Sequence, residues 1–131
     1  MNKINIFIVD DHQIFLDGIS SLLEEEEQIQ ILGTAHNGKV AIDKIAALSS
    51  EVNVVLMDIN MPGMDGYTLT AKIREMEKYS NIPIVAVTAN VMRGDREKSL
   101  EAGCDGYIQK PIDIDTLAQQ IERFITRRTN V

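Results

Sequence analysis

Three aspartates that directly follow apolar segments are the residues of this 131-residue chain with the clearest potential for chemistry. Asp10 and Asp11 follow the segment Ile4–Val9, and Asp58 follows the segment Val52–Met57. A carboxylate can bind a hard divalent cation, and it can also attack an activated phosphoryl group as a nucleophile. If the two segments are parallel strands, the three carboxylates lie together at one edge of a sheet.

Two further apolar segments end in residues that suit the same site. Thr88 follows Ile82–Val87, and Lys110 follows Gly106–Gln109. A hydroxyl and an ammonium group can both stabilise negative charge on phosphoryl oxygens. Each of these residues alone is better explained as a turn, capping or surface residue. Together with the three aspartates they stand at the ends of four different predicted strands, which favours a common site.

The charge of this predicted site calls for a cation. Three ionised carboxylates repel one another at short range, and Lys110 offsets only one of them. A divalent ion balances the rest, and a ligand set made of oxygen atoms suits Mg²⁺, with Mn²⁺ as a substitute. One cysteine and two histidines do not supply a zinc site.

The elements that must position these residues follow from the hydrophobic pattern. Five apolar segments alternate with helical patterns, which predicts an α/β fold with a parallel sheet. The third and fourth segments are almost continuously apolar, as in strands that are buried on both faces, and belong at the centre of the sheet. The five predicted strands are Ile4–Val9, Ile29–Ala35, Val52–Met57, Ile82–Val87 and Gly106–Gln109.

Five helices are expected in this pattern, and their apolar residues recur at three- and four-residue spacing. The predicted core-facing residues are Phe15, Ile19, Leu22 and Leu23 in the first helix and Leu117, Ile121, Phe124 and Ile125 in the last. Short polar side chains predict the N-terminal caps of the second, third and fifth helices, which are Asn37, Asp65 and Asp113. The fourth helix is predicted from about Val91 to Ala102, with Gly94 interrupting it.

Composition narrows the class of protein. The length suits one domain over residues 1–131, and the net charge of −7 argues against direct nucleic-acid binding. No apolar run reaches the roughly 18 residues of a membrane span and the start lacks a signal peptide, so a cytoplasmic location without membrane contact is expected. The acidic run Glu24–Glu27 is interpreted as a solvated surface, and Cys104 as a core or loop residue.

Four motifs in this order resemble those of the response-regulator receiver domains, which include stand-alone chemotaxis proteins and domains of hybrid histidine kinases. The motifs are VDDH at 9–12, MDINMPGMDG at 57–66, VTA at 87–89 and GYIQKP at 106–111. The resemblance extends from Ile4 to Phe124. It implies a flavodoxin-like doubly wound sheet of five parallel strands in the order 2-1-3-4-5, with helices on both faces.

The resemblance also implies roles for the residues at the strand ends. Asp58 would be phosphorylated by a phosphohistidine of a sensor histidine kinase or phosphotransfer protein. Asp11, Asp58 and the backbone carbonyl of Asn60 would bind Mg²⁺ directly, and Asp10 would act through water. Lys110 would contact the phosphoryl group.

Further roles implied by the resemblance concern switching. Thr88 and Tyr107 would move together and reshape an output face formed by the fourth helix, fifth strand and fifth helix, which would contact a downstream protein target. Ala89 would leave room for phosphotransfer, and Asn90, like Asn60, would tune the lifetime of the phosphoryl group. The bond to Pro111 would be cis.

Three other interpretations compete with this one. A haloacid dehalogenase-type phosphatase carries a second aspartate two residues after the nucleophile, where this chain has Asn60, so a turnover enzyme is not expected. A calcium-binding EF-hand loop is excluded, because Pro62 and Leu69 stand at positions where such a loop needs metal ligands. A receiver-like interaction module that works without phosphate remains the alternative.

Two expectations complete the prediction. His12 and His36 have no role in the proposed chemistry and are interpreted as structural or solvent-facing. Met1 lies close to the first predicted strand, which favours a stand-alone regulator over a piece of a larger hybrid kinase.

Overall fold

The computed structural model describes residues 4–27, 29–48, 52–59, 61, 63–88, 95–109, 117, 119–121 and 123. Strands and helices alternate along the chain, with one short 3-10 helix, η1, before the fourth strand. In order, the elements are β1 (Ile4–Val9), α1 (Gln13–Glu24), β2 (Ile29–Ala35), α2 (Gly38–Ala47), β3 (Val54–Asp58), α3 (Gly66–Glu75), η1 (Glu77–Tyr79), β4 (Ile84–Thr88), α4 (Asp95–Ala102) and β5 (Gly106–Gln109). Leu117, residues 119–121 and Arg123 are also helical.

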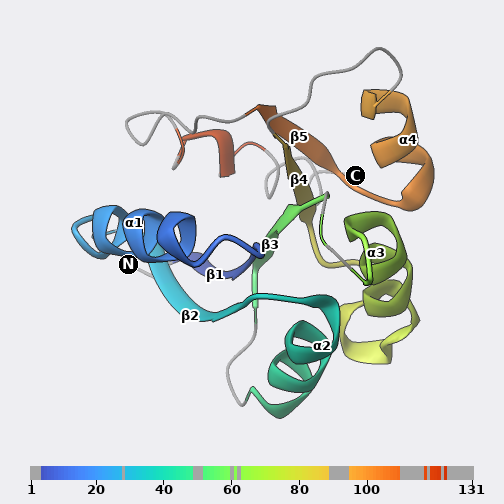
Figure 1. The fold of residues 1–131 in the computed structure, drawn as a ribbon, viewed down its shortest axis with the longest axis horizontal. Coiled ribbons are helices and arrows are strands. Elements are labelled where there is room, and N and C mark those ends of the chain that lie inside the picture. The colour runs from blue at the N-terminus through green and yellow to red at the C-terminus, as the bar shows by residue number, and fades with distance from the viewer. Residues whose placement is uncertain are drawn as a thin grey trace.

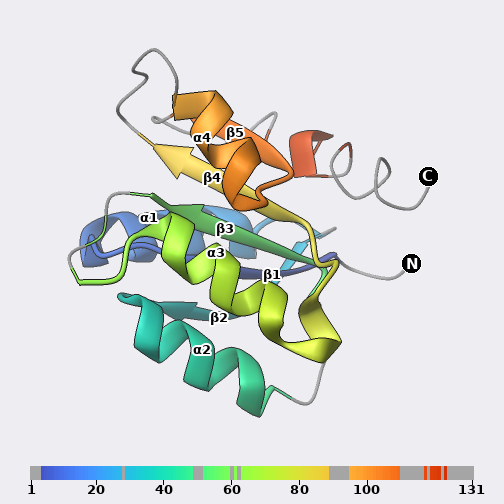
Figure 2. The same cartoon turned by 90° about the vertical axis from the view of Figure 1, so that its right-hand side faces the viewer.

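The five strands form one sheet in the order β2-β1-β3-β4-β5, and every neighbouring pair is parallel. Figure 1 shows α1 and the short helical segment drawn in red on one face of the sheet, and α2, α3 and α4 on the other. In Figure 2 these three helices lie side by side in front of the strands. The doubly wound α/β fold and its strand order are therefore as predicted.

Each face of the sheet carries its own apolar core. One core lies between α1, the last helical residues and the face of the sheet that they cover. Its helical members include Leu16, Ile19, Leu117 and Ile121. The other joins the opposite face to α2 and α3, where Ile45 belongs to the core. Every residue of β3 and β4 is buried, which confirms that these strands are central.

The starts and ends of the two central strands differ from the prediction. β3 begins at Val54 and includes Asp58, and β4 begins at Ile84 and includes Thr88. Val52 and Ile82 are buried, but they precede the strands. A residue can be buried without pairing with a neighbouring strand, so its apolar character does not mark the start of a strand. Before β4 the reason is Pro83, which has no N–H to donate to a neighbouring strand.

The prediction for α1 is wrong for one residue of its apolar face. Leu22 is 49% exposed, and Leu16 lies in the core instead, with Ile19 and Leu23. The buried residues are spaced by three and four positions, which leaves Leu22, next to Leu23, outside the stripe. Phe15 is partly buried against the same core, as expected.

The predicted caps of α2 and α3 are confirmed. The side chain of Asn37 accepts a hydrogen bond of 2.8 Å from the Val40 amide, and that of Asp65 accepts one of 2.8 Å from the Thr68 amide. The described part of α4 begins at Asp95. The predictions that concern Val91, Gly94, Asp113, Phe124 and Ile125 lie outside the described residues.

Surface and core residues outside the site mostly follow the prediction. Glu24, Glu25 and Glu27 are exposed, and Cys104 is buried. Within the described ranges, no helix combines the length and the apolar character that crossing a bilayer requires.

Candidate functional site

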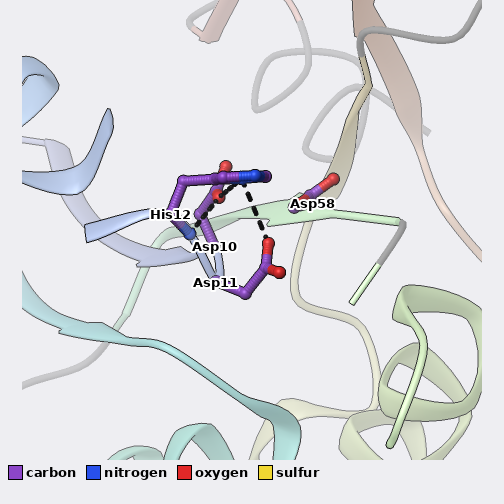
Figure 3. Close-up of side chains that lie close together, drawn as sticks. All are labelled: Asp10, Asp11, His12 and Asp58. Carbon is purple, nitrogen blue, oxygen red and sulfur yellow. Dashed lines mark hydrogen bonds and ion pairs between the residues drawn. The ribbon is translucent and has the colours of Figure 1, made fainter. Parts of the chain in front are cut away.

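The three predicted aspartates lie together at the carboxyl end of the sheet. β1 and β3 are adjacent parallel strands in which Val9 pairs with Met57, so the next residues, Asp10 and Asp58, lie side by side. One possible ligand atom from each of Asp10, Asp11, His12 and Asp58 lies within 4.8 Å of the other three. Figure 3 shows these four side chains, which we call the carboxylate cluster.

The three carboxylates of the cluster are largely withdrawn from water. Asp10 and Asp58 are only 1% and 4% exposed, and the Asp11 side chain is 23% exposed. A cavity of about 10 Å³ beside Asp10 and Asp58 is otherwise lined by apolar side chains, among them Phe15 and Leu56. Electrostatic interactions are stronger in such surroundings than in water, so the mutual repulsion of these carboxylates is poorly screened.

The turn between β1 and α1 holds the two neighbouring aspartates. The Asp10 amide donates to the Ala35 carbonyl at 3.0 Å, which extends the pairing with β2 by one residue. Asp10 Oδ1 accepts from the His12 amide at 2.9 Å and lies 3.1 Å from His12 Nδ1. Asp11 Oδ1 lies 3.2 Å from the same ring nitrogen. Both carboxylates therefore face one imidazole at the start of the helix.

A close approach between β3 and α3 positions Asp58. The Gly66 amide donates to the Ile59 carbonyl at 2.9 Å, so the helix begins directly against the end of the strand. A Cβ atom at Gly66 would lie 2.8 Å from Ile59 Cα and 2.9 Å from the Asp58 carbonyl oxygen. Such distances are shorter than a Cβ atom tolerates, so only glycine permits this packing.

Thr88 and Tyr107 lie on the strands beyond Asp58. Asp58 pairs with Val87 in β4, so Thr88 is one residue further along the neighbouring strand, and it is only 1% exposed. Tyr107 of β5 pairs with Ala86, two residues before Thr88, and therefore shares its face of the sheet. Tyr107 is half-buried against the core of that face.

Several predicted site residues lie outside the described residues. Lys110 directly follows Gln109, which pairs with Thr88, but Lys110 itself is not one of the described residues. The same holds for Asn60, Ala89, Asn90 and Pro111, including the predicted cis bond.

His12 is the member of the cluster that sequence reasoning did not include. Its side chain is 67% exposed, in line with a solvent-facing residue, yet its ring contacts both Asp10 and Asp11. The signal was its position directly after two aspartates, at the turn into a helix. His36 is exposed, as expected.

The donors of the cluster fit a divalent cation. Asp11 Oδ1 is buried and accepts no hydrogen bond from any residue that the structure describes, although His12 Nδ1 lies near it. An oxygen atom with unused acceptor capacity beside two further carboxylates is the donor set that hard cations such as Mg²⁺ prefer. The cluster can therefore combine cation binding with a carboxylate nucleophile.

Comparison with known proteins assigns the family. The model of the response regulator receiver domain matches residues 6–122, and this chain belongs to that family. The sensor histidine kinase RcsC of Salmonella typhimurium is 35% identical over 127 residues, which cover 93% of this chain and 12% of the kinase. The polar-differentiation response regulator DivK of Brucella anthropi is 30% identical, with 92% of this chain and 95% of DivK covered.

Solved structures share the fold over nearly the whole chain. The receiver domain of sensor histidine kinase PA1611 from Pseudomonas aeruginosa, solved with a magnesium ion in its active-site cleft, is 30% identical with a TM-score of 0.81, and the match covers 95% and 98% of the two chains. The receiver domain of Saccharomyces cerevisiae Ssk1 in complex with the phosphotransfer protein Ypd1 has 27% identity, a TM-score of 0.81 and coverages of 97% and 92%. Both are receiver domains of two-component signalling, as this chain is.

Proposed function

We propose that this chain is a phosphorylation-dependent switch that accepts a phosphoryl group on Asp58 from a phosphohistidine of a sensor histidine kinase or phosphotransfer protein. The observation that carries the proposal is the gathering of Asp10, Asp11 and Asp58 at the ends of the adjacent strands β1 and β3. The Ssk1 receiver domain, which was solved with a phosphotransfer protein, supports this kind of partner.

The cluster would hold Mg²⁺, with Mn²⁺ as a substitute. Asp11 and Asp58 would bind the ion directly together with the Asn60 backbone carbonyl, and Asp10 would act through water. The bound ion supplies positive charge beside the phosphoryl oxygens, as divalent cations do in phosphoryl transfer. The magnesium ion in the cleft of the PA1611 receiver domain supports this assignment.

The chemical step is a transfer between two residues. A carboxylate oxygen of Asp58 attacks phosphorus, the P–N bond of the phosphohistidine breaks, and an acyl phosphate forms on Asp58 while the imidazole leaves with the bonding electron pair. Lys110 would contact the phosphoryl oxygens. Asn60 stands where a turnover phosphatase has its acid–base aspartate, so we propose a switch rather than a turnover enzyme.

The response to phosphorylation would run through Thr88 and Tyr107. The Thr88 hydroxyl would move toward the phosphoryl group, and the Tyr107 ring would turn inward and change the face formed by α4, β5 and the last helix. The shared face of the sheet and the partial burial of Tyr107 support this coupling. A downstream protein would recognise the altered face.

The decisive experiment is phosphorylation with acetyl phosphate and Mg²⁺. We expect an adduct on Asp58 that is stable in acid and cleaved by hydroxylamine, detected by mass spectrometry. The Asp58→Asn variant should form no adduct, whereas Asp65→Asn, which keeps an oxygen to cap α3, should form it normally. An adduct that survives in Asp58→Asn would contradict the proposal.

A second measurement separates the switch from an interaction module that works without phosphate. Beryllofluoride with Mg²⁺ imitates an acyl phosphate without a donor protein. We expect it to shift the NMR signals of Thr88 and Tyr107. Unchanged signals at both residues under saturating beryllofluoride would favour the module.

A further inference from the structure

The His12 imidazole occupies a position in the carboxylate cluster that suits a metal ligand. Its Nδ1 atom lies 3.1 Å from Asp10 Oδ1 and 3.2 Å from Asp11 Oδ1, as Figure 3 shows with dashed lines. Adjacent ligands of an octahedral ion with bonds of about 2.1 Å lie about 3.0 Å apart, and opposite ligands about 4.2 Å apart. The 4.8 Å limit on the four ligand atoms is close to that upper value. Small side-chain adjustments therefore suffice to place the His12 imidazole beside Asp11 and Asp58 around one ion, while Asp10 acts through water.

A nitrogen donor changes which ions such a site prefers. Carboxylate oxygens suit Mg²⁺, whereas imidazole nitrogen suits borderline transition ions such as Ni²⁺ and Co²⁺. Neutral imidazole has one nitrogen lone pair for a metal, so binding at Nδ1 leaves the ring proton on Nε2. The His12 side chain is 67% exposed, so the ring can also turn away when hydrated Mg²⁺ occupies the cluster.

We propose that His12 is a specificity-determining metal ligand, through which this site binds divalent transition ions such as Ni²⁺, Co²⁺ and Cu²⁺ with mixed nitrogen and oxygen coordination. The inference rests on the proposed function for the presence of a divalent cation at the cluster. It adds that the imidazole, and not the carboxylates alone, sets the choice of ion.

Isothermal titration calorimetry with NiCl₂ and with MgCl₂ tests the proposal on protein without a polyhistidine tag. In His12→Ala we expect the ratio of Ni²⁺ to Mg²⁺ affinity to fall at least about tenfold, because loss of even an outer-shell partner costs about 10–100-fold in metal affinity. His36→Ala is the matched control, since His36 is the other histidine of the chain and is exposed. It should leave the ratio unchanged.

A second variant separates ligation from positioning. His12→Asn keeps an N–H donor near the place of Nδ1, and so can still hold Asp10 and Asp11, but it has no imidazole. We expect the same fall in the Ni²⁺ to Mg²⁺ ratio as in His12→Ala. A ratio restored by asparagine, or equal losses of Ni²⁺ and Mg²⁺ affinity in His12→Ala, would show that His12 only positions the carboxylates and would overturn the proposal.

Pulsed electron paramagnetic resonance of Cu²⁺-loaded protein without a polyhistidine tag gives a direct readout, because Cu²⁺ is paramagnetic and imidazole suits it as a ligand. We expect a hyperfine coupling to a histidine nitrogen in the wild type and in His36→Ala, and its loss in His12→Ala and His12→Asn. Absence of this coupling from the wild type would overturn the inference. Failure of the proposed function is a separate result, namely a wild type that neither binds Mg²⁺ nor forms the Asp58 adduct.

Discussion

Charged side chains are at least partly buried at both ends of the sheet, but their charges are balanced at one end and not at the other. At the end opposite the carboxylate cluster, Arg74 Nη2 lies 2.9 Å from Asp105 Oδ2 and donates to the Gly103 carbonyl at 2.8 Å. Arg74 Nη1 donates to the Ile82 carbonyl, and Asp105 Oδ2 accepts from the Ile84 amide at 2.9 Å. We call this set the Arg74 network.

The difference is one of charge balance within the chain. The Arg74 network pairs opposite charges and adds backbone partners, so its groups are satisfied by the fold itself, and it ties the end of α3 to the starts of β4 and β5. The carboxylate cluster gathers three like charges with one histidine. Under the function proposed above, this arrangement serves an ion and a phosphoryl group from outside the chain at a cost in stability.

The largest effect is expected from breaking the Arg74 network. Arg74→Met should lower the free energy of unfolding by about 3 kcal/mol, because the partly buried Asp105 carboxylate and the Ile82 and Gly103 carbonyls all lose their hydrogen-bond donor. Urea denaturation measures the change. Lys72→Met, on the exposed side of the same helix, is the control and should cost less than about 0.5 kcal/mol. Equal losses in both variants would mean that the network is not a structural clamp.

A somewhat smaller effect is expected from cation binding at the carboxylate cluster. Mg²⁺ at 100 times its dissociation constant should stabilise the folded protein by about 2.7 kcal/mol, because it binds only the folded state. The Asp11→Ala variant should show no such gain. Arg74→Met should keep it, although its starting stability is lower. Stabilisation of Asp11→Ala by Mg²⁺ would place the ion elsewhere.

Replacing aspartate by asparagine should change the free energy of unfolding in opposite directions at the two ends of the sheet. Without divalent ions, Asp58→Asn should raise the free energy of unfolding by on the order of 1 kcal/mol, because it removes one of three repelling charges. Asp105→Asn should lower it, since the Arg74 guanidinium loses its counter-charge. Both variants are compared by urea denaturation in the presence of a chelator. A loss of stability in Asp58→Asn would contradict this view of the cluster.

The smallest effect concerns Cys104, which is buried near the Arg74 network. Burial raises the pKa of its thiol, outweighing the Thr70 hydrogen bond and the Arg74 charge, which lower it. Less of the thiol is therefore ionised at pH 8 than in an unfolded chain, and iodoacetamide should label it slowly in the native protein. Labelling should be faster in Arg74→Met, because the loss of stability exposes the thiol more often and outweighs the rise in pKa that follows from removing the Arg74 charge. It should be unchanged or slower in Asp58→Asn. Rapid labelling of the wild type would show that this end of the sheet opens readily.

Much of the fold follows from local patterns in the sequence. Alternating strand and helix patterns predict the α/β class, and single polar residues such as Asn37 and Asp65 predict helix starts, because a cap depends on neighbours only three residues away. The predicted boundaries of β3 and β4 were less accurate than the predicted caps. Val52 and Ile82 are apolar because they are buried, and apolar character alone does not say whether a residue pairs with a neighbouring strand.

The sequence by itself determined that carboxylates stand at the ends of apolar strands, and this was enough to predict Asp10, Asp11 and Asp58 as one site. Only the tertiary structure decided that the His12 ring turns back onto Asp10 and Asp11, and that Arg74 meets Asp105 across 31 residues. Such contacts depend on a side-chain rotation or on packing between elements far apart in the chain. Neither leaves a periodic signal, whereas strand ends and helix caps do.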